Sequence, residues 1–168
     1  MNKKLLTTLC SVLVLAACSN NDRPPNRPPT IGTIADQSIT ANQQSAPIGF
    51  TVADEAPSAL GFQVVSDNSA VVPDGAIVVG GAVTNRSLTI TPTTDVLGDA
   101  FVTVIATDFA GLSASSTFLL TVAPEQQALQ AFTRATFAAP ANGEPVPINA
   151  IEFNDDAAND DFADLLAN

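Results

Sequence analysis

The 168-residue sequence contains no histidine, tryptophan or tyrosine, and its only lysines are Lys3 and Lys4. Histidine is the commonest general base in enzymes, and lysine is a frequent nucleophile. Without them, the serines and threonines have no base to activate them. A carboxylate pair such as Asp54 and Asp108 has no Trp or Tyr platform to hold a sugar. The sequence therefore predicts no catalytic residue and no bound organic cofactor.

Basic residues and cysteines are also scarce. The chain has 6 Lys and Arg against 17 Asp and Glu, so a chain that begins at Cys18 has a net charge of 4 − 17 = −13. Nucleic acid, which is bound through clustered basic residues, is excluded as a partner. The two cysteines are Cys10 and Cys18. Neither is expected to form a disulfide. Cys10 lies in a segment predicted to be removed, and the thiol of Cys18 is predicted to be acylated.

Residues 1–17 have the pattern of an export signal. Lys3 and Lys4 form the charged start, the apolar stretch 5–17 follows, and the stretch ends in small residues. Its 13 residues are too few for a membrane-spanning helix, which needs about 20. We therefore predict a signal peptide over residues 1–17.

The end of this stretch, Leu15-Ala16-Ala17-Cys18, resembles the lipobox of bacterial lipoproteins. The resemblance implies cleavage before Cys18, acylation of its thiol and amine, and a stable lipid anchor in the membrane. A secretory peptide that is cut elsewhere, with Cys18 as a free thiol, is the alternative. Ser19 stands where an aspartate would retain an enterobacterial lipoprotein in the inner membrane. The prediction is a bacterial cell-envelope protein, with the outer membrane favoured over the inner one.

Residues 18–29 are predicted to form a tether. Apart from four prolines, residues 19–29 have no aliphatic side chain. They are therefore expected to run as solvated polyproline II at about 3.1 Å per residue.

Residues 30–123 are typical of an antiparallel β-sandwich. Short runs rich in Val, Ile, Phe and Thr alternate with turn residues, and no helical periodicity interrupts them. The inward side chains are predicted to be Phe50, Val52, Leu88, Ile90, Val104, Phe118 and Leu120. For residues 101–106, either Val102 and Val104 or Phe101 and Ile105 form the inner set. About seven strands are expected, at 31–40, 48–52, 60–65, 76–79, 87–91, 101–106 and 117–122.

Several stretches in this region, including Asn26–Ile31, Phe50–Asp54, Leu88–Pro92 and Ala106–Asp108, resemble the Ig-like, cadherin-like repeats of bacterial surface proteins. The resemblance covers residues 26–123 and implies a single Ig-like sandwich. In that family the repeats serve as adhesive stalks or spacers. An antibody-type domain is excluded, because its cysteine pair, tryptophan and corner tyrosine are absent.

The cadherin-like resemblance also implies calcium, a metal that prefers oxygen ligands. Asp36, Asp54, Glu55 and Asp108 lie near predicted strand ends and are the candidate ligands. Cadherin sites require clustered acidic motifs at the junction of two domains, whereas this chain has one domain and Asp108 is followed by Phe109 and Ala110. Calcium binding and solvated charge are therefore the two interpretations, with solvated charge favoured.

Residues 124–168 form a segment of different composition, with eight acidic residues and one base, Arg134. A short helix is predicted over residues 125–137, and the remainder is expected to have low order because acidic, aromatic-poor sequences bury little. The mixture of aspartates with Phe153, Phe162, Leu165 and Leu166 also resembles a docking segment.

The function favoured by the sequence is a lipid-anchored, non-catalytic interaction or spacer module. Two alternatives are open. One is a surface adhesin for carbohydrate or protein, for which Phe62, Phe101 and Phe109 are the candidate contacts, although core positions are favoured for Phe62 and Phe101. The other is an accessory subunit of an envelope enzyme. The expected partners are the membrane, through the lipid, and a protein or glycan of the envelope.

Overall fold

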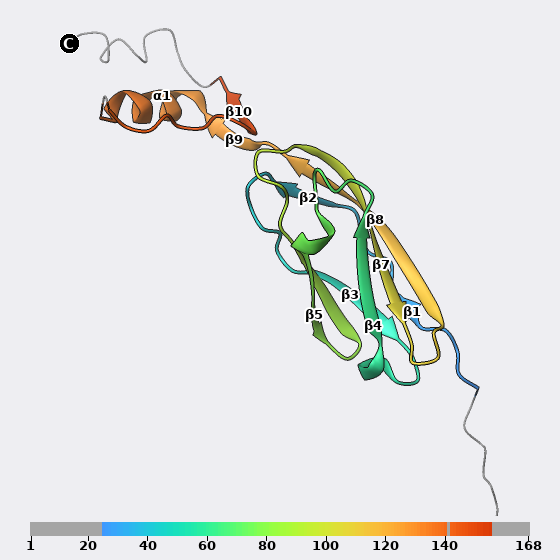
Figure 1. Ribbon diagram of the computed structural model, residues 1–168. Helices are drawn as coiled ribbons and strands as arrows, with labels where there is room; N and C mark the ends of the chain where they lie inside the picture. The colour runs from blue at the N-terminus through green and yellow to red at the C-terminus, as the bar shows by residue number, and fades with distance from the viewer. Residues whose placement is uncertain (1–24, 141, 156–168) are drawn as a thin grey trace, which may run out of the picture.

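The chain folds as an all-β sandwich of two four-stranded sheets, followed by a small unit with one helix (Figure 1). The computed structural model describes residues 25–140 and 142–155. One sheet has the order β1–β3–β6–β5 and the other the order β2–β8–β7–β4. The strand bounds are β1 Thr30–Ile31, β2 Gln37–Thr40, β3 Ile48–Ala53, β4 Gly61–Ser66, β5 Ile77–Ala82, β6 Asn85–Ile90, β7 Gly98–Thr107 and β8 Ser113–Ala123.

This strand order is that of an Ig-like domain, in which strands A, B, E and D form one sheet and C, F and G the other. In the first sheet β1, β3, β6 and β5 correspond to A, B, E and D, and in the second β4, β7 and β8 correspond to C, F and G. Short 3-10 turns over Pro57–Ala59 and Asp74–Ala76 precede β4 and β5. The fold class predicted from the sequence is confirmed.

The first edge strand is divided between the two sheets, which raises the predicted seven strands to eight. β1 pairs antiparallel with β3, whereas β2 pairs parallel with β8. The crossing is held by Gly32, whose amide donates to the Thr51 carbonyl at 2.8 Å, and by Asp36, whose Oδ1 accepts from the Leu119 amide at 2.8 Å. A Cβ on Gly32 would lie 2.5 Å from Thr51 Oγ1, so a larger residue here would force the Thr51 side chain to move.

The core lies between the sheets and contains every inward residue that the alternation predicted. All seven are less than 9% exposed: Phe50, Val52, Leu88, Ile90, Val104, Phe118 and Leu120. In β7 the inner set is Val102 and Val104, both fully buried, and Phe101 is 53% exposed. The core position favoured for Phe101 was therefore wrong. The register explains this, because Phe101 pairs with Leu119 on the outer face of the sheet.

Beyond the sandwich, the chain forms a strand, a helix and a second strand where the sequence indicated a short helix and low order. β9 (Glu125–Ala128) pairs in parallel with β10 (Ile151–Asn154), and α1 (Leu129–Ala138) connects from β9. We call β9, α1 and β10 the C-terminal unit. The Phe132 and Phe153 rings, with centroids 4.8 Å apart, join the helix to β10. Because β9 and β10 are far apart in the sequence, no local pattern predicted that they pair.

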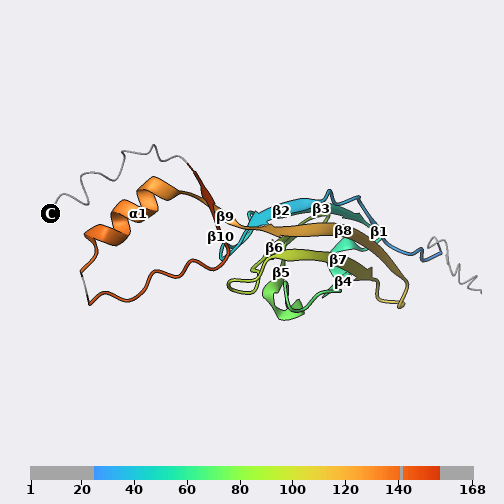
Figure 2. The ribbon, with the colours of Figure 1, turned by 90° about the horizontal axis from the view of Figure 1, so that it is seen from above.

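The two connections of the sandwich lie at opposite ends. Figures 1 and 2 show the first described residues beside β1 at one end and the C-terminal unit beyond the other. We call these ends the N-terminal pole and the C-terminal pole. At the C-terminal pole, Ala150 packs against the core and its carbonyl accepts from the Glu125 amide at 2.8 Å. The C-terminal unit is therefore attached directly to the sandwich.

Candidate functional site

The aspartates of the sandwich serve mainly as hydrogen-bond acceptors within the fold. Each of the seven accepts a side-chain hydrogen bond, and five accept from backbone amides: Asp36, Asp54, Asp67, Asp74 and Asp108. Hydrogen bonds to a carboxylate are stronger than those between neutral groups. Asp54 and Asp108 thus satisfy amides of their own turns, whereas Asp36, Asp67 and Asp74 accept from amides of the strands β8, β7 and β4. No pattern in the sequence indicated this role for Asp67 and Asp74, or the hydrogen bond that Asp99 accepts from the Thr121 hydroxyl.

Asp108 has the most extensive set of contacts and is 7% exposed. Its Oδ1 accepts from the amides of Ala110 and Leu112, each at 2.8 Å, and its Oδ2 accepts from Asn26 Nδ2 at 2.6 Å. Burial raises the pKa of the Asp108 carboxyl, but the hydrogen bonds from Asn26 and the backbone outweigh burial and leave the pKa below its ordinary value. Asp108 is therefore an ionised, structural residue of the β7–β8 turn.

Asn26 and Pro29 belong to the folded domain, although the sequence placed them in a solvated tether. Pro29 is buried and Asn26 is half-buried. Two stretches that carried the family resemblance, one ending at Asp108 and the other beginning at Asn26, thus meet in space. The hydrogen bond between Asn26 and Asp108 was indicated in the sequence only by the presence of both family-like stretches.

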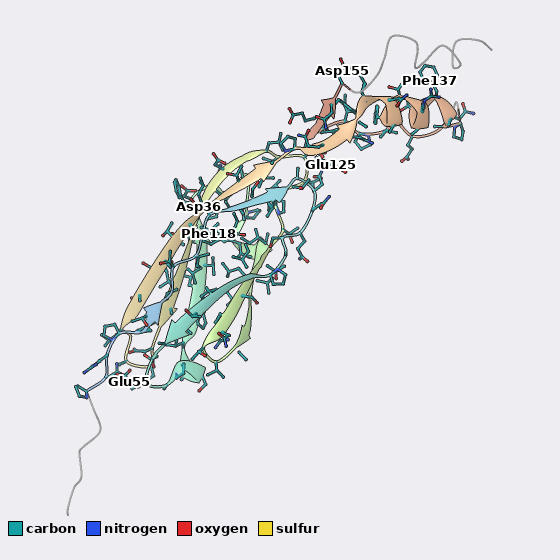
Figure 3. All side chains as sticks on the ribbon, turned by 180° about the vertical axis from the view of Figure 1, so that it is seen from behind. Asp36, Glu55, Phe118, Glu125, Phe137 and Asp155 are labelled. Carbon is teal, nitrogen blue, oxygen red and sulfur yellow. The ribbon has the colours of Figure 1, made fainter. Side chains whose placement is uncertain are left out.

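The four calcium candidates do not form one cluster. Asp54 and Glu55 line an open cavity of about 340 Å³ at the N-terminal pole, together with Arg27, Pro28, Thr30 and Ala53. Asp36 lies farther along the sandwich, as Figure 3 shows by its distance from Glu55. Within residues 25–140 and 142–155, no three acidic or cysteine side chains come together as metal ligands.

Asp54 illustrates why these carboxylates are poor ligands. Its Oδ1 accepts from the Ala56 amide at 2.7 Å, and its Oδ2 is buried with no partner among the described residues. Glu55 is exposed. A Ca²⁺ ion takes six to eight oxygen ligands, which this pair does not supply. The arrangement fits solvated and structural carboxylates.

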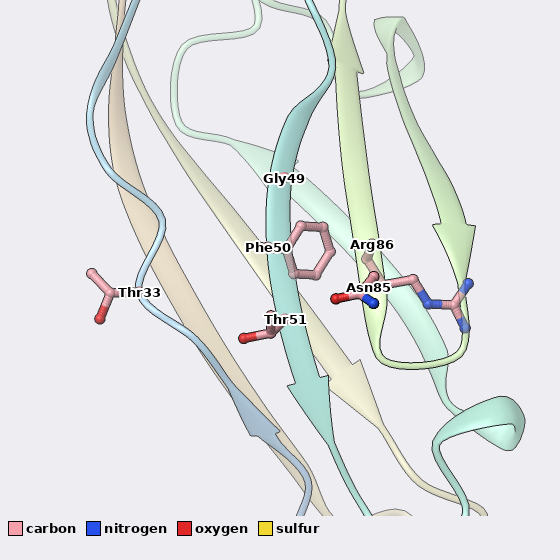
Figure 4. Close-up of a pocket in the computed structure, with 6 residues that line it drawn as sticks. All are labelled: Thr33, Gly49, Phe50, Thr51, Asn85 and Arg86. Carbon is pink, nitrogen blue, oxygen red and sulfur yellow. The ribbon is translucent and has the colours of Figure 1, made fainter.

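A second open cavity of about 340 Å³ lies beside β3 and β6 and is lined by Thr33, Gly49, Phe50, Thr51, Asn85 and Arg86 (Figure 4). Among its lining residues, Arg86 is the one with a charged side chain. The Arg86 Nε donates to the Val83 carbonyl at 3.1 Å, and the guanidinium carbon lies 4.8 Å from the centre of the Phe62 ring. The six lining residues include hydroxyls, an amide and a guanidinium but no carboxylate. This cavity therefore has neither a nucleophile–base pair nor a metal-ligand set.

Of the three candidate phenylalanines, two are on the surface. Phe101 is 53% exposed and Phe109 is 62% exposed. Phe62 is half-buried and meets Phe50 edge-on at a centroid distance of 6.2 Å, so it belongs to the margin of the core as expected. Around Phe101, the outer face of β7 and β8 is a ladder in which the apolar Phe101–Leu119 pair lies between two polar pairs, Thr103–Thr117 and Asp99–Thr121.

Cys18 and the lipobox residues Leu15, Ala16 and Ala17 lie outside the described residues. The same holds for Phe162, Leu165 and Leu166. In the part of the chain that the structure describes, no helix has the length and apolar character needed to cross a membrane.

Comparison with known proteins gives structural neighbours only. No protein-family model matches the chain, and no curated protein matches it significantly. The titin M4 domain is 16% identical, with a TM-score of 0.44 over 59% of this chain and 99% of that one. Domains 4 and 5 of the S-layer protein SbsC are 16% identical, with a TM-score of 0.41 over 56% and 53%. The human desmocollin-1 ectodomain is 11% identical, with a TM-score of 0.47 over 62% and 24%. The assignment of the Ig-like fold rests on the strand order and register described above.

Proposed function

We propose that this protein is a lipid-anchored protein of the bacterial cell envelope whose Ig-like sandwich is a non-catalytic interaction or spacer module. The lipid would be attached to Cys18 after cleavage at Ala17. The sandwich then holds the C-terminal unit away from the membrane, where a protein partner binds.

The observation that carries this proposal is the placement of the two poles. The described chain begins at the N-terminal pole, beside β1, and the C-terminal unit extends from the opposite pole (Figure 1). An anchor that precedes residue 25 would therefore place the whole length of the sandwich between itself and the C-terminal unit. A spacer needs this geometry, because its two attachments must lie far apart.

The cavities support a non-catalytic role. Both are open. One is lined by Arg, Thr and Asn side chains, and the other by Asp54 and Glu55, with no histidine or lysine base in either. Acyl transfer by a serine or threonine needs a base within hydrogen-bond reach of the nucleophile.

The lipid anchor is tested by replacing Cys18 with alanine in the full chain. Cys18→Ala should accumulate as unprocessed precursor and should lose labelling by a fatty-acid analogue, whereas the control Cys10→Ala should be processed and labelled normally. Labelling that persists in Cys18→Ala would exclude the anchor. Fractionation of the envelope, with Ser19→Asp as the variant expected to move the protein to the inner membrane, tests the localisation.

A second candidate function, that of a surface adhesin, is favoured by the exposed Phe101, which pairs with the half-buried Leu119 on the outer face of β7 and β8. Exposed aromatic side chains are frequent at protein contacts. Phe101→Ser should reduce adherence of cells that display the protein. Val78→Ser, which alters a side chain that is 60% exposed on β5, is the matched control. Equal adherence of the two variants would argue against this function.

A further inference from the structure

The C-terminal unit has regular secondary structure without a buried core. None of its described residues is buried, and the residues of α1 are all half-buried or exposed. Parallel sheets normally have both faces covered, and a two-stranded sheet is marginally stable in water. The contact between Phe132 and Phe153 is one aromatic pair for the whole unit. A unit with so little internal packing would be stabilised by a partner that covers its surface.

Large apolar side chains of this part of the chain face solvent. Phe137 is 63% exposed, Ile148 57% and Val146 51%. Figure 3 shows Phe137 at the end of α1 that is remote from the sandwich. On a unit without a buried residue, these side chains are apolar surface that a partner can cover.

Charge identifies the occupant of this site. In the sequence, residues 124–155 carry Glu125, Glu144, Glu152 and Asp155 against Arg134. A second copy of the chain would bring the same acidic surface, and the chain's own residues 156–168 add four aspartates and no base. Both occupants are opposed by like-charge repulsion. A segment with lysine or arginine is favoured by the same electrostatics.

The edge of β10 determines the shape of that segment. Within residues 25–140 and 142–155, β10 pairs only with β9, so its other edge has backbone groups that an added strand can bond. Ile151 and Phe153 are half-buried and alternate with the exposed Glu152, whose Oε2 accepts from Gln126 at 2.5 Å. β9 has no such pattern, because its residues are Glu, Gln, Gln and Ala.

We propose that β10 is the docking edge for an extended protein segment in which apolar side chains alternate with lysine or arginine. The apolar side chains of that segment lie beside Ile151 and Phe153, on the face of the sheet toward α1. Its basic side chains lie beside Glu152 on the other face, as opposite charges on adjacent strands attract. This inference rests on the proposed function as an interaction module and names the site and the partner chemistry.

The test uses the full chain in detergent and a labelled nine-residue peptide of alternating Lys and Ile or Val, at about 0.15 M salt to screen long-range attraction. Fluorescence anisotropy should show saturable binding, and amide exchange should show new protection at residues 151–154. The control peptide has the same sequence with alternate backbone amides methylated, which keeps charge and hydrophobicity but removes the strand hydrogen bonds. It should bind at least about tenfold more weakly.

Two protein variants test the role of the Glu152 charge without disturbing the fold of the C-terminal unit. Glu152→Gln retains an acceptor for Gln126 and should weaken peptide binding several-fold, whereas Glu55→Gln at the N-terminal pole should have no effect. Equal binding of the methylated peptide would overturn the proposal. A free protein that sediments as a dimer with β10 already protected would overturn it in favour of a second copy. Neither result alters the fractionation and labelling of Cys18→Ala, so failure of the docking edge and failure of the lipid anchor are distinguishable.

Discussion

Asn26 Nδ2 lies 2.6 Å from Asp108 Oδ2, although 82 positions separate the two residues. This hydrogen bond ties the chain that precedes β1 to the turn between β7 and β8. Together with the buried Pro29, it makes residues 26–29 part of the domain. The predicted tether is therefore shorter by four residues, about 12 Å at the rise of polyproline II, and the direction in which the chain leaves the sandwich is fixed by a specific contact.

The contact predicts that Asn26→Ala destabilises the sandwich. The variant leaves the Asp108 Oδ2 atom without its side-chain donor, and a buried acceptor without a partner is costly. The urea midpoint of unfolding should fall, and the control Arg27→Ala, at an exposed neighbouring position, should leave it nearly unchanged. A fragment of residues 25–123 should likewise be more stable than one of residues 30–123. Identical midpoints for the two fragments would show that residues 25–29 contribute nothing to the fold.

Acid should weaken the contribution of Asp108. Because its pKa in the folded protein is below the ordinary value of 3.8, the folded state binds the proton less readily than the unfolded state. The resulting stabilisation is fully present above pH 3.8 and is lost as the pH falls through the lowered value. Urea unfolding at a series of pH values should show a smaller loss of stability in acid for Asp108→Asn than for the unmodified protein. Parallel curves would refute the assignment.

The core predicts a clear contrast between two phenylalanines on neighbouring strands. Phe118 is 2% exposed and Phe101 is 53% exposed. Phe118→Ala should lower the free energy of unfolding by about 3–5 kcal/mol because it leaves a cavity. Phe101→Ala should change it by no more than about 0.5 kcal/mol, as expected for a surface position. Urea unfolding followed by circular dichroism measures both, and similar losses would mean that the register of β7 is shifted by one residue.

Calcium should not stabilise the protein. The Oδ1 atoms of Asp36, Asp54 and Asp108 each accept from a backbone amide, so a metal would compete with these hydrogen bonds. The melting temperature in millimolar calcium should equal that in EDTA. A rise of several degrees with calcium would indicate a site that binds the folded state.

Amide exchange should distinguish the C-terminal unit from the sandwich. The amides of Ile151–Asn154 belong to a unit without buried residues, whereas β7 and β8 border the core. Exchange in the free monomer should therefore be faster in β10 than in β7 by orders of magnitude, since local opening requires little loss of packing. Equal protection of the β10 and β7 amides would show that the C-terminal unit is as stable as the sandwich without a partner.

The sequence alone determined the fold class, most strands of the sandwich and most of the core. Alternation with a period of two is a local property, and it identified Phe50, Leu88 and Phe118 as inward residues because adjacent side chains of a strand point to opposite faces. The same local pattern was ambiguous where both faces carry apolar residues. For β7, only pairing with β8 decided that Val102 faces the core and Phe101 faces outward.

Relationships between distant segments were decided by the tertiary structure. No local pattern indicates that the Asp36 carboxylate accepts from the Leu119 amide, that Asn26 reaches Asp108, or that β10 pairs with β9. These contacts depend on how the sheets pack and on the register of their strands, since a buried polar group requires a partner that the fold brings to it. A carboxylate in a turn and one in solvent have the same sequence signature, so the structural role of the aspartates emerged only when the sandwich placed amides within their reach.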